Sequence, residues 1–280
     1  MVARNHERAT GRLIACIVVC MVMAKSFCLA QVGVSPQYLF YDLERKSMPI
    51  SVSNPGDATV EVTCSALTGY VTSDDTGRTL VSYDSTDTSI PSAARWVQFY
   101  PSHFIVEPKS FQTVRLVATP APGSADGEYW ARLAFTSKPA KARSEIKQAA
   151  GLTLIHRVVI PFHYRLGRVS TGLTATNLRT TSDQREVVVT LDVARTGNAA
   201  YWGSATARIL DKGGSILASA TRKVAVYKNY TVRLRISRDK IPAGDYTLDV
   251  RLETGNRGDI ADARLIKAPP VLMRNDINLR

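Results

Sequence analysis

Cysteine is scarce in this chain, and three of its four cysteines lie within the first 30 residues. That segment has the order of a secretory signal: arginines, the apolar run Leu13 to Ala24, and then Cys28-Leu29-Ala30, whose small residues fit the positions that signal peptidase reads. We expect residues 1–30 to be removed, so that the mature chain keeps only Cys64 and forms no internal disulfide. The alternative, an uncleaved membrane anchor, is disfavoured because Lys25 interrupts an apolar run shorter than the roughly 20 residues of a spanning helix.

Catalytic and metal-binding motifs are also missing. The chain has no Gly-x-Ser-x-Gly turn, no glycine-rich phosphate loop and no His-Glu-x-x-His sequence. His156 and His163 differ in parity along one expected strand, so they point to opposite faces and cannot share a metal ion. We therefore expect no enzyme activity, no catalytic residues, no metal site and no cofactor.

Long runs with helical apolar spacing are absent as well. Short runs of alternating apolar and polar residues take their place, separated by Gly, Pro, Asn and Asp, as in residues 187–193, 230–236 and 246–252. Each run has one apolar and one mostly polar face, which is typical of strands in a β-sandwich. Cys64 falls on the apolar face of such a strand, which predicts a buried thiol with a structural role.

No block of like charge accompanies the formal net charge of +12. Basic residues instead alternate with apolar ones along the expected strands, as Arg233 and Arg235 do. This pattern is typical of a solvated sheet face, and we expect no nucleic-acid partner for an exported chain.

A short internal repeat indicates two related sandwiches. Residues 113–116, Thr-Val-Arg-Leu, recur as residues 231–234, and each copy is followed by a turn and a tyrosine, Tyr129 and Tyr246. This is the pattern of a tyrosine corner, in which the hydroxyl bonds back to the backbone. The expected fold is therefore all-β, with two tandem immunoglobulin-like β-sandwich domains.

A short hinge is expected between these domains. The segment Leu166 to Gly172 breaks the strand pattern with two glycines, which gives domains of residues 31–166 and 173–280 with a cleft between them. Residues Tyr70 to Arg95 are too long and polar for an ordinary hairpin connection, and the sequence leaves the role of this insertion open.

Three ordered motifs stand in the expected first domain. They are residues 41–56 (YDLERKSMPISVSNPG), residues 100–116, in which Tyr-Pro leads to Gln-Thr-Val-Arg-Leu, and residues 127–135 (GEYWARLAF). Together they resemble the periplasmic chaperones of the chaperone-usher pathway, the PapD-like family. The resemblance implies a divergent member that binds and caps incomplete pilus or fimbrial subunits in the periplasm and delivers them to an outer-membrane usher, with no stable membrane insertion after signal cleavage.

In that family the last strand of the first domain is lent to a subunit that lacks a strand, so that main-chain hydrogen bonds give affinity and alternate side chains fill the subunit's groove. The matching segment here is Gly151 to Tyr164, and both of its faces are largely apolar. One face can then pack on the domain's own core while the other stays available; a fully buried central strand is the alternative. The resemblance implies these subunit-binding residues: Leu152, Leu154, His156 and Val158.

Two departures from the family pattern bear on function. Family members grip the subunit's terminal carboxylate with two basic residues, but Tyr38 and Pro161 occupy those positions here. Arg157 and Arg165 are the nearest basic substitutes, with a solvated-face role as the alternative for each. A second function therefore stays open, that of a structural or adhesive component of a bacterial surface assembly.

Overall fold

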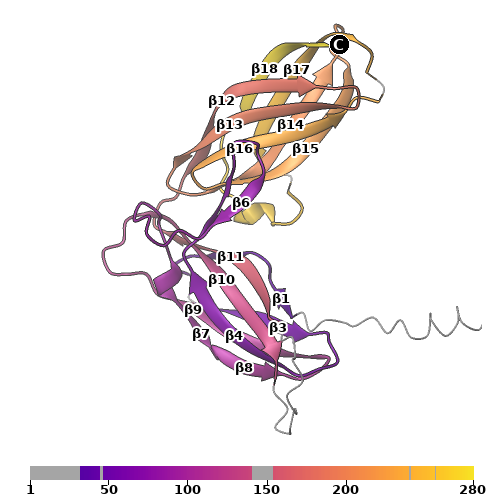
Figure 1. Cartoon of the computed structure of the whole chain (residues 1–280). Helices are drawn as coiled ribbons and strands as arrows, with labels where there is room; N and C mark the ends of the chain where they lie inside the picture. Colours follow the sequence, from indigo (N-terminus) through magenta and orange to yellow (C-terminus); the bar gives the residue numbers. More distant parts are fainter. Residues whose placement is uncertain (1–31, 45–46, 141–153, 240, 256) are drawn as a thin grey trace, which may run out of the picture.

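The computed structural model contains two β-sandwiches set at an angle to each other (Figure 1). Its described residues are 32–44, 47–140, 154–239, 241–255 and 257–280. They include two short 3-10 helices, η1 (Ala94–Trp96) and η2 (Asp262–Arg264), and among them no helix is long and apolar enough to cross a membrane. The expected all-β fold of two tandem immunoglobulin-like sandwiches is confirmed, while the signal predicted over residues 1–30 lies outside the described residues.

The first sandwich consists of a four-stranded and a five-stranded sheet, with strand orders β1-β3-β9-β7 and β2-β11-β10-β4-β8. The four-stranded sheet contains β1 (Gly33–Ser35), β3 (Ser47–Asn54), β7 (Val97–Tyr100) and β9 (Ser110–Ala118). The five-stranded sheet contains β2 (Leu39–Tyr41), β4 (Val60–Leu67), β8 (His103–Val106), β10 (Gly127–Pro139) and β11 (His156–Leu166).

The second sandwich has strand orders β12-β13-β16 and β15-β14-β17-β18, and all of its pairs are antiparallel. One sheet contains β12 (Thr171–Ser182), β13 (Glu186–Gly197) and β16 (Asn229–Ser237). The other contains β14 (Tyr201–Leu210), β15 (Ile216–Val226), β17 (Gly244–Thr254) and β18 (Val271–Leu279).

The alternating residues build a separate core in each sandwich. On β4 the inner face carries Val60, Val62 and Cys64, which are all buried. Burial raises the pKa of the Cys64 thiol to about 12, which keeps it protonated and unreactive. The predicted structural position of Cys64 is therefore confirmed.

Both predicted tyrosine corners are present. The Tyr129 hydroxyl donates a hydrogen bond to the carbonyl of Ala125 at 2.9 Å, and the Tyr246 hydroxyl donates one to the carbonyl of Pro242 at 3.0 Å. The two tyrosines lie at the starts of β10 and β17, and the repeated Thr-Val-Arg-Leu segments lie on β9 and β16. The sequence repeat thus corresponds to the same corner in two sandwiches.

The junction between the sandwiches has its own buried cluster. Phe40 and Trp130 come from the first sandwich, and Trp202 and Tyr227 come from the second. Strand β11 ends at Leu166 and β12 begins at Thr171. The domain limits 31–166 and 173–280 remain a proposal that places the boundary in this connection.

The insertion predicted at residues 70–95 contains a hairpin of β5 (Tyr70–Ser73) and β6 (Thr79–Ser82). It leaves the first sandwich and reaches the strands of the second (Figure 1).

Candidate functional site

Strand β11 has one edge that is only partly covered. On one side it pairs with β10 along its whole length, from Leu166 opposite Gly127 to His156 opposite Ser137. On the other side β2 pairs with it in parallel, and that pairing covers Phe162 to Tyr164. Residues 156–161 therefore present backbone groups at an edge that no described strand occupies.

The even-numbered side chains of β11 face the core of the first sandwich, and their burial declines toward the start of the strand. Ile160 is 4% exposed and belongs to the core, and Val158 packs against that core while partly exposed. His156 is half-buried, and Leu154, just before the strand, is 39% exposed. The core is thus shielded from solvent near Ile160 and exposed to solvent near Leu154. Of the predicted subunit-binding residues, Leu152 lies outside the described residues.

The neighbouring odd-numbered side chains face the other way. The Arg157 Nε donates a hydrogen bond to the Thr136 hydroxyl across the β10–β11 pair, at 3.1 Å. Val159 and Pro161 lie further along and line a cavity between the two sandwiches. The open edge of β11 therefore runs into this cavity, which we call the cleft cavity.

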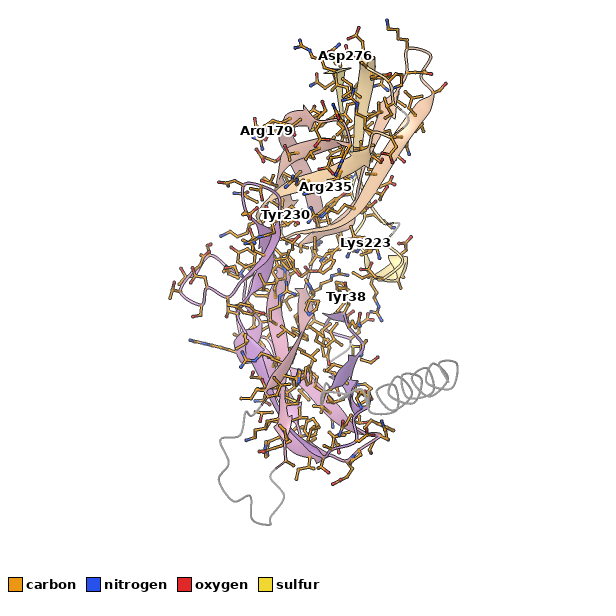
Figure 2. The ribbon with its side chains drawn as sticks, turned by 45° about the vertical axis from the view of Figure 1, so that its right-hand side comes forward. Tyr38, Arg179, Lys223, Tyr230, Arg235 and Asp276 are labelled. Atoms are coloured by element: carbon orange, nitrogen blue, oxygen red, sulfur yellow. The ribbon has the colours of Figure 1, made fainter. Side chains whose placement is uncertain are left out.

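The cleft cavity has a volume of about 570 Å³ and receives residues from both sandwiches. Tyr38 and Pro161, which the sequence resemblance aligns with the family's basic positions, both line it. The Tyr38 hydroxyl donates a hydrogen bond to Asp259 at 3.1 Å, across the junction. Figure 2 places Tyr38 and Lys223 together where the two sandwiches meet.

Three basic side chains line the cleft cavity, and two of them are already paired. Asp259 accepts an ion pair from Arg257 at 3.0 Å and one from Lys223 at 3.6 Å. The third is Arg132 of β10, which is 6% exposed. Its Nη2 lies 3.5 Å from the Tyr227 hydroxyl, which is at the limit of a hydrogen bond.

Arg132 has unmet bonding capacity. Among the described residues its Nε has no hydrogen-bond partner and its guanidinium forms no ion pair, although the guanidinium carbon lies 5.6 Å from the centre of the Tyr227 ring. A buried charge without a counter-ion is costly unless a ligand completes it. The sequence analysis gave Arg132 no role, although an arginine inside the apolar run Tyr129 to Phe135 was the available signal.

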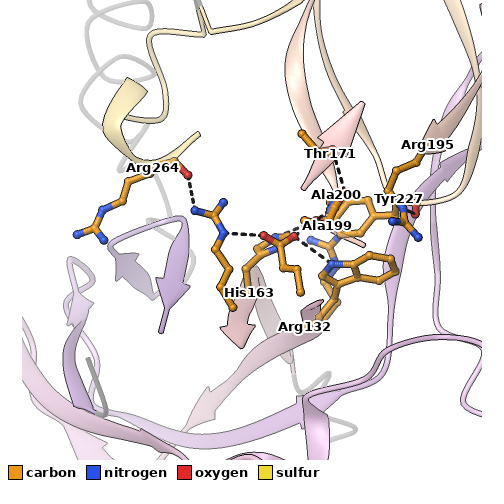
Figure 3. Close-up of polar contacts among 11 residues, drawn as sticks. Arg132, His163, Thr171, Arg195, Ala199, Ala200, Tyr227 and Arg264 are labelled. Atoms are coloured by element: carbon orange, nitrogen blue, oxygen red, sulfur yellow. Dashed lines mark hydrogen bonds and ion pairs between the residues drawn. The ribbon is translucent and has the colours of Figure 1, made fainter. Parts of the chain in front are cut away.

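Arg165, one of the two predicted anchors, belongs to a different cluster. Its Nε forms an ion pair with Glu128 at 2.9 Å, and its Nη1 donates to the carbonyl of Arg264 in the second sandwich at 2.7 Å (Figure 3). Neither Arg165 nor Arg157 lines the cleft cavity. Of Arg132, Arg157 and Arg165, Arg132 alone lines the cleft cavity.

Glu128 is the centre of this buried cluster. Figure 3 labels His163, Tyr227, Ala200 and Arg264 around it. Besides Arg165, Glu128 accepts hydrogen bonds from the Trp130 indole at 3.1 Å and from the backbone N–H of Ala200 at 3.2 Å, and it lies 2.9 Å from Nδ1 of His163. Since Ala200 lies in the second sandwich, the carboxylate links the two sandwiches directly.

The electrostatics of the cluster keep Glu128 charged and His163 neutral. Burial by itself raises the pKa of Glu128, but the charge of Arg165 and the hydrogen bonds from Arg165 and His163 outweigh it, so the pKa of this carboxyl lies below its usual range. Burial lowers the pKa of His163, although Glu128 opposes that shift. A neutral ring fits both neighbours, since Nδ1–H donates to Glu128 and Nε2 accepts from the Tyr227 hydroxyl at 3.0 Å.

Neither a protein-family model nor a curated protein matches the chain. Similar solved structures include the YadV chaperone, which is 14% identical, with 89% of this chain and 100% of that one covered and a TM-score of 0.46. They also include the SafB chaperone in complex with the SafA pilin of Salmonella enterica (16%, 88% and 96%, TM-score 0.45) and the CupB2 chaperone of Pseudomonas aeruginosa (15%, 89% and 100%, TM-score 0.43). Identities and TM-scores of this size do not assign a family, a function or a partner to this chain.

Proposed function

We propose that this chain is a periplasmic chaperone that binds and caps incomplete pilus or fimbrial subunits by donor-strand addition and delivers them to an outer-membrane usher. The periplasmic location rests on the signal predicted at residues 1–30, and delivery to an usher rests on the sequence resemblance.

The half-open edge of β11 carries the proposal. Natural sheets normally cover or charge an edge strand, because a bare edge pairs with other chains. Residues 156–161 instead keep a bare edge beside a core that opens toward Leu154. A subunit strand that paired there would continue the five-stranded sheet, and the subunit's own core would cover Leu154 and His156.

The cleft cavity supplies an end point for the added strand. Strand β2 occupies the edge from Phe162 onward, so a strand that follows β11 in this direction meets β2 and the cavity. In this proposal a carboxylate at the end of the subunit chain pairs with the guanidinium of Arg132, which takes the role that Tyr38 and Pro161 cannot fill. A charge-assisted, forked contact of this kind suits arginine.

A structural or adhesive role in a surface assembly is the second candidate. It is favoured by the tight junction, in which Glu128 and the aromatic cluster join the sandwiches as a permanent unit would. In that role Leu154 would be covered by the chain itself or by a permanent neighbour.

The substitution Leu154→Glu tests donor-strand addition. We expect the variant to lose capture of a co-expressed pilus subunit that lacks a strand, because an unpaired charge buried in the subunit's groove costs roughly 3–5 kcal/mol, or about 100-fold or more in affinity. The measurement is the amount of subunit that co-purifies from the periplasm, together with thermal unfolding of the free protein, which should shift little.

Leu272→Glu is the matched control, because Leu272 is another exposed leucine, on β18 of the second sandwich. It should capture the subunit as the parent does. If Leu154→Glu instead unfolds the free protein, the segment belongs to the domain's own core and the scaffold function becomes the better one.

A further inference from the structure

The β5–β6 hairpin of the first sandwich is seated on the second sandwich. Its contacts lie on β15 and β16, which are edge strands of the two sheets of that sandwich. The Ser73 hydroxyl accepts a hydrogen bond at 2.6 Å from the backbone N–H of Thr231, which lies on β16. The hairpin thus occupies part of the edge of β16.

Arg222 and Tyr230 hold the far end of the hairpin (Figure 2 labels Tyr230). Arg222 of β15 donates to the carbonyl of Gly77 at 3.1 Å and to the Thr79 hydroxyl at 2.6 Å. The Tyr230 hydroxyl lies 2.6 Å from the same threonine hydroxyl. Beyond the hairpin, Lys228 forms an ion pair with Asp87 at 3.1 Å, so the insertion is tied to the second sandwich at two places.

The turn of the hairpin lies very close to β16. Gly77 has φ of +77°, and a Cβ placed there would lie 2.6 Å from the Cβ of Arg233 and 3.1 Å from the carbonyl oxygen of Thr231. The Asp74 side chain accepts hydrogen bonds from the backbone N–H groups of Thr76 and Arg78, and these local bonds stabilise the turn. Glycine is therefore needed at residue 77 for contact with β16 as well as for its backbone conformation.

The base of the hairpin reaches the junction. The Tyr70 ring lies 6.3 Å from that of Trp130 and 6.2 Å from that of Tyr227, so it bridges aromatic residues of both sandwiches. Val71 packs against the second core, and Val71 and Thr79 both line the cleft cavity.

From these contacts we infer that the β5–β6 hairpin is a clamp between the sandwiches: it fixes the angle between them and forms one wall of the cleft cavity. The connection from Leu166 to Thr171 is short and carries one glycine, Gly167, and its backbone bonds Asp126 and Asn198. The hairpin adds a second set of contacts between the sandwiches, away from the connection itself. The clamp goes beyond the proposed function, because it acts in the free protein whatever partner the cleft receives.

The test compares two glycines with the same backbone conformation. Gly77→Ala creates the clash with β16, whereas Gly123→Ala, at φ of +76°, places its Cβ where no atom lies within 4 Å. Both variants place an alanine in the left-handed backbone region, so both introduce the same backbone strain. Only Gly77→Ala also disturbs the contact between the hairpin and β16. Exported protein would carry nitroxide labels on Thr113→Cys of β9 and Asn275→Cys of β18, both exposed, while the buried Cys64 stays unlabelled.

We expect Gly77→Ala to broaden the distribution of label-to-label distances measured by pulsed electron resonance, and Gly123→Ala to leave it as in the parent. Thr79→Val with Tyr230→Phe removes hydroxyl contacts without the clash and should broaden the distribution less. If Gly77→Ala and this double variant both match the parent, the remaining contacts at the junction set the angle and the clamp is disproved. Since no subunit takes part in the measurement, this outcome would leave the donor-strand proposal intact.

Discussion

Arg132 lowers the stability of the free protein, but its position suits it to bind a ligand. Its guanidinium is buried and lacks a counter-ion among the described residues, which does not favour the fold, yet it lines the cleft cavity at the end of the open edge. A group that weakens the free protein and faces a cavity is the expected signature of a binding residue.

Arg132→Met therefore has opposite expected effects on stability and on binding. The free protein should unfold at the same or a higher temperature, because a buried unpaired charge is replaced by an apolar side chain of similar length. Binding should lose its preference for a free carboxylate: the parent should bind a subunit-derived peptide acid about 10-fold or more tightly than the matching amide, since a hydrogen bond to a charged group contributes roughly 1.5–3 kcal/mol.

Isothermal titration with the two peptides measures this preference. Arg157→Met is the control, because Arg157 bonds Thr136 on the outer face and does not line the cleft cavity. Loss of the acid preference in the control and its survival in Arg132→Met would assign the anchor to Arg157.

For single residues, the sequence predicted well which face of a strand a side chain lies on. It predicted poorly which distant residues that side chain contacts. The buried face of Cys64 and the two tyrosine corners follow from alternation and local turns, and the structure confirms them. Arg233 was expected on a solvated face, but the hairpin partly covers it, which depends on a contact between residues 77 and 233 that no local pattern reports.

Strand β11 is the element whose behaviour depends most on its neighbours. Residues 162–164 pair on both sides, whereas residues 156–160 pair with β10 alone, and Pro161 has no N–H to donate. The sequence predicted an apolar strand here and left two alternatives, an available edge and a fully buried central strand. Strand β2 is three residues long, so it covers only residues 162–164 of β11. That part has strands on both sides, whereas residues 156–161 lie at an edge.

Hydrogen exchange followed by NMR should resolve the two halves. In an antiparallel pair alternate N–H groups point toward the neighbour, so about half of the amides from 156 to 160 should exchange quickly in the free protein. The amides of Phe162 to Tyr164 should exchange slowly. When a subunit is bound, the fast amides should become protected; uniform protection of residues 156–160 in the free protein would mean that the edge is already covered.

Across the whole molecule, the two sandwiches share a buried junction. Trp202 is central to it: its ring lies 6.0 Å from Phe40, 5.0 Å from His163 and 5.9 Å from Tyr227. The sequence predicted a hinge and a cleft, but it could not predict this cluster, whose members come from strands far apart in the chain and meet only when both sandwiches have formed.

Trp202→Ala should uncouple the sandwiches. Removal of a buried tryptophan costs roughly 3–5 kcal/mol, and here much of that loss falls on contacts between the sandwiches. Scanning calorimetry should show one cooperative transition for the parent and two for the variant. Tyr100→Ala, at an exposed tyrosine of β7, should keep a single transition, and two transitions in the parent would mean that the junction contributes little coupling.

The edges of β16 and β11 differ in how far they are covered, and this difference affects the behaviour of the free protein in solution. The hairpin shields part of β16, while the apolar half of β11 stays bare. A bare strand edge can pair with a second copy of the same chain, so we expect self-association of the free protein to rise with its concentration. Any chain that occupied the β11 edge would block this self-association, so the solubility of the protein should depend on whether that edge is occupied.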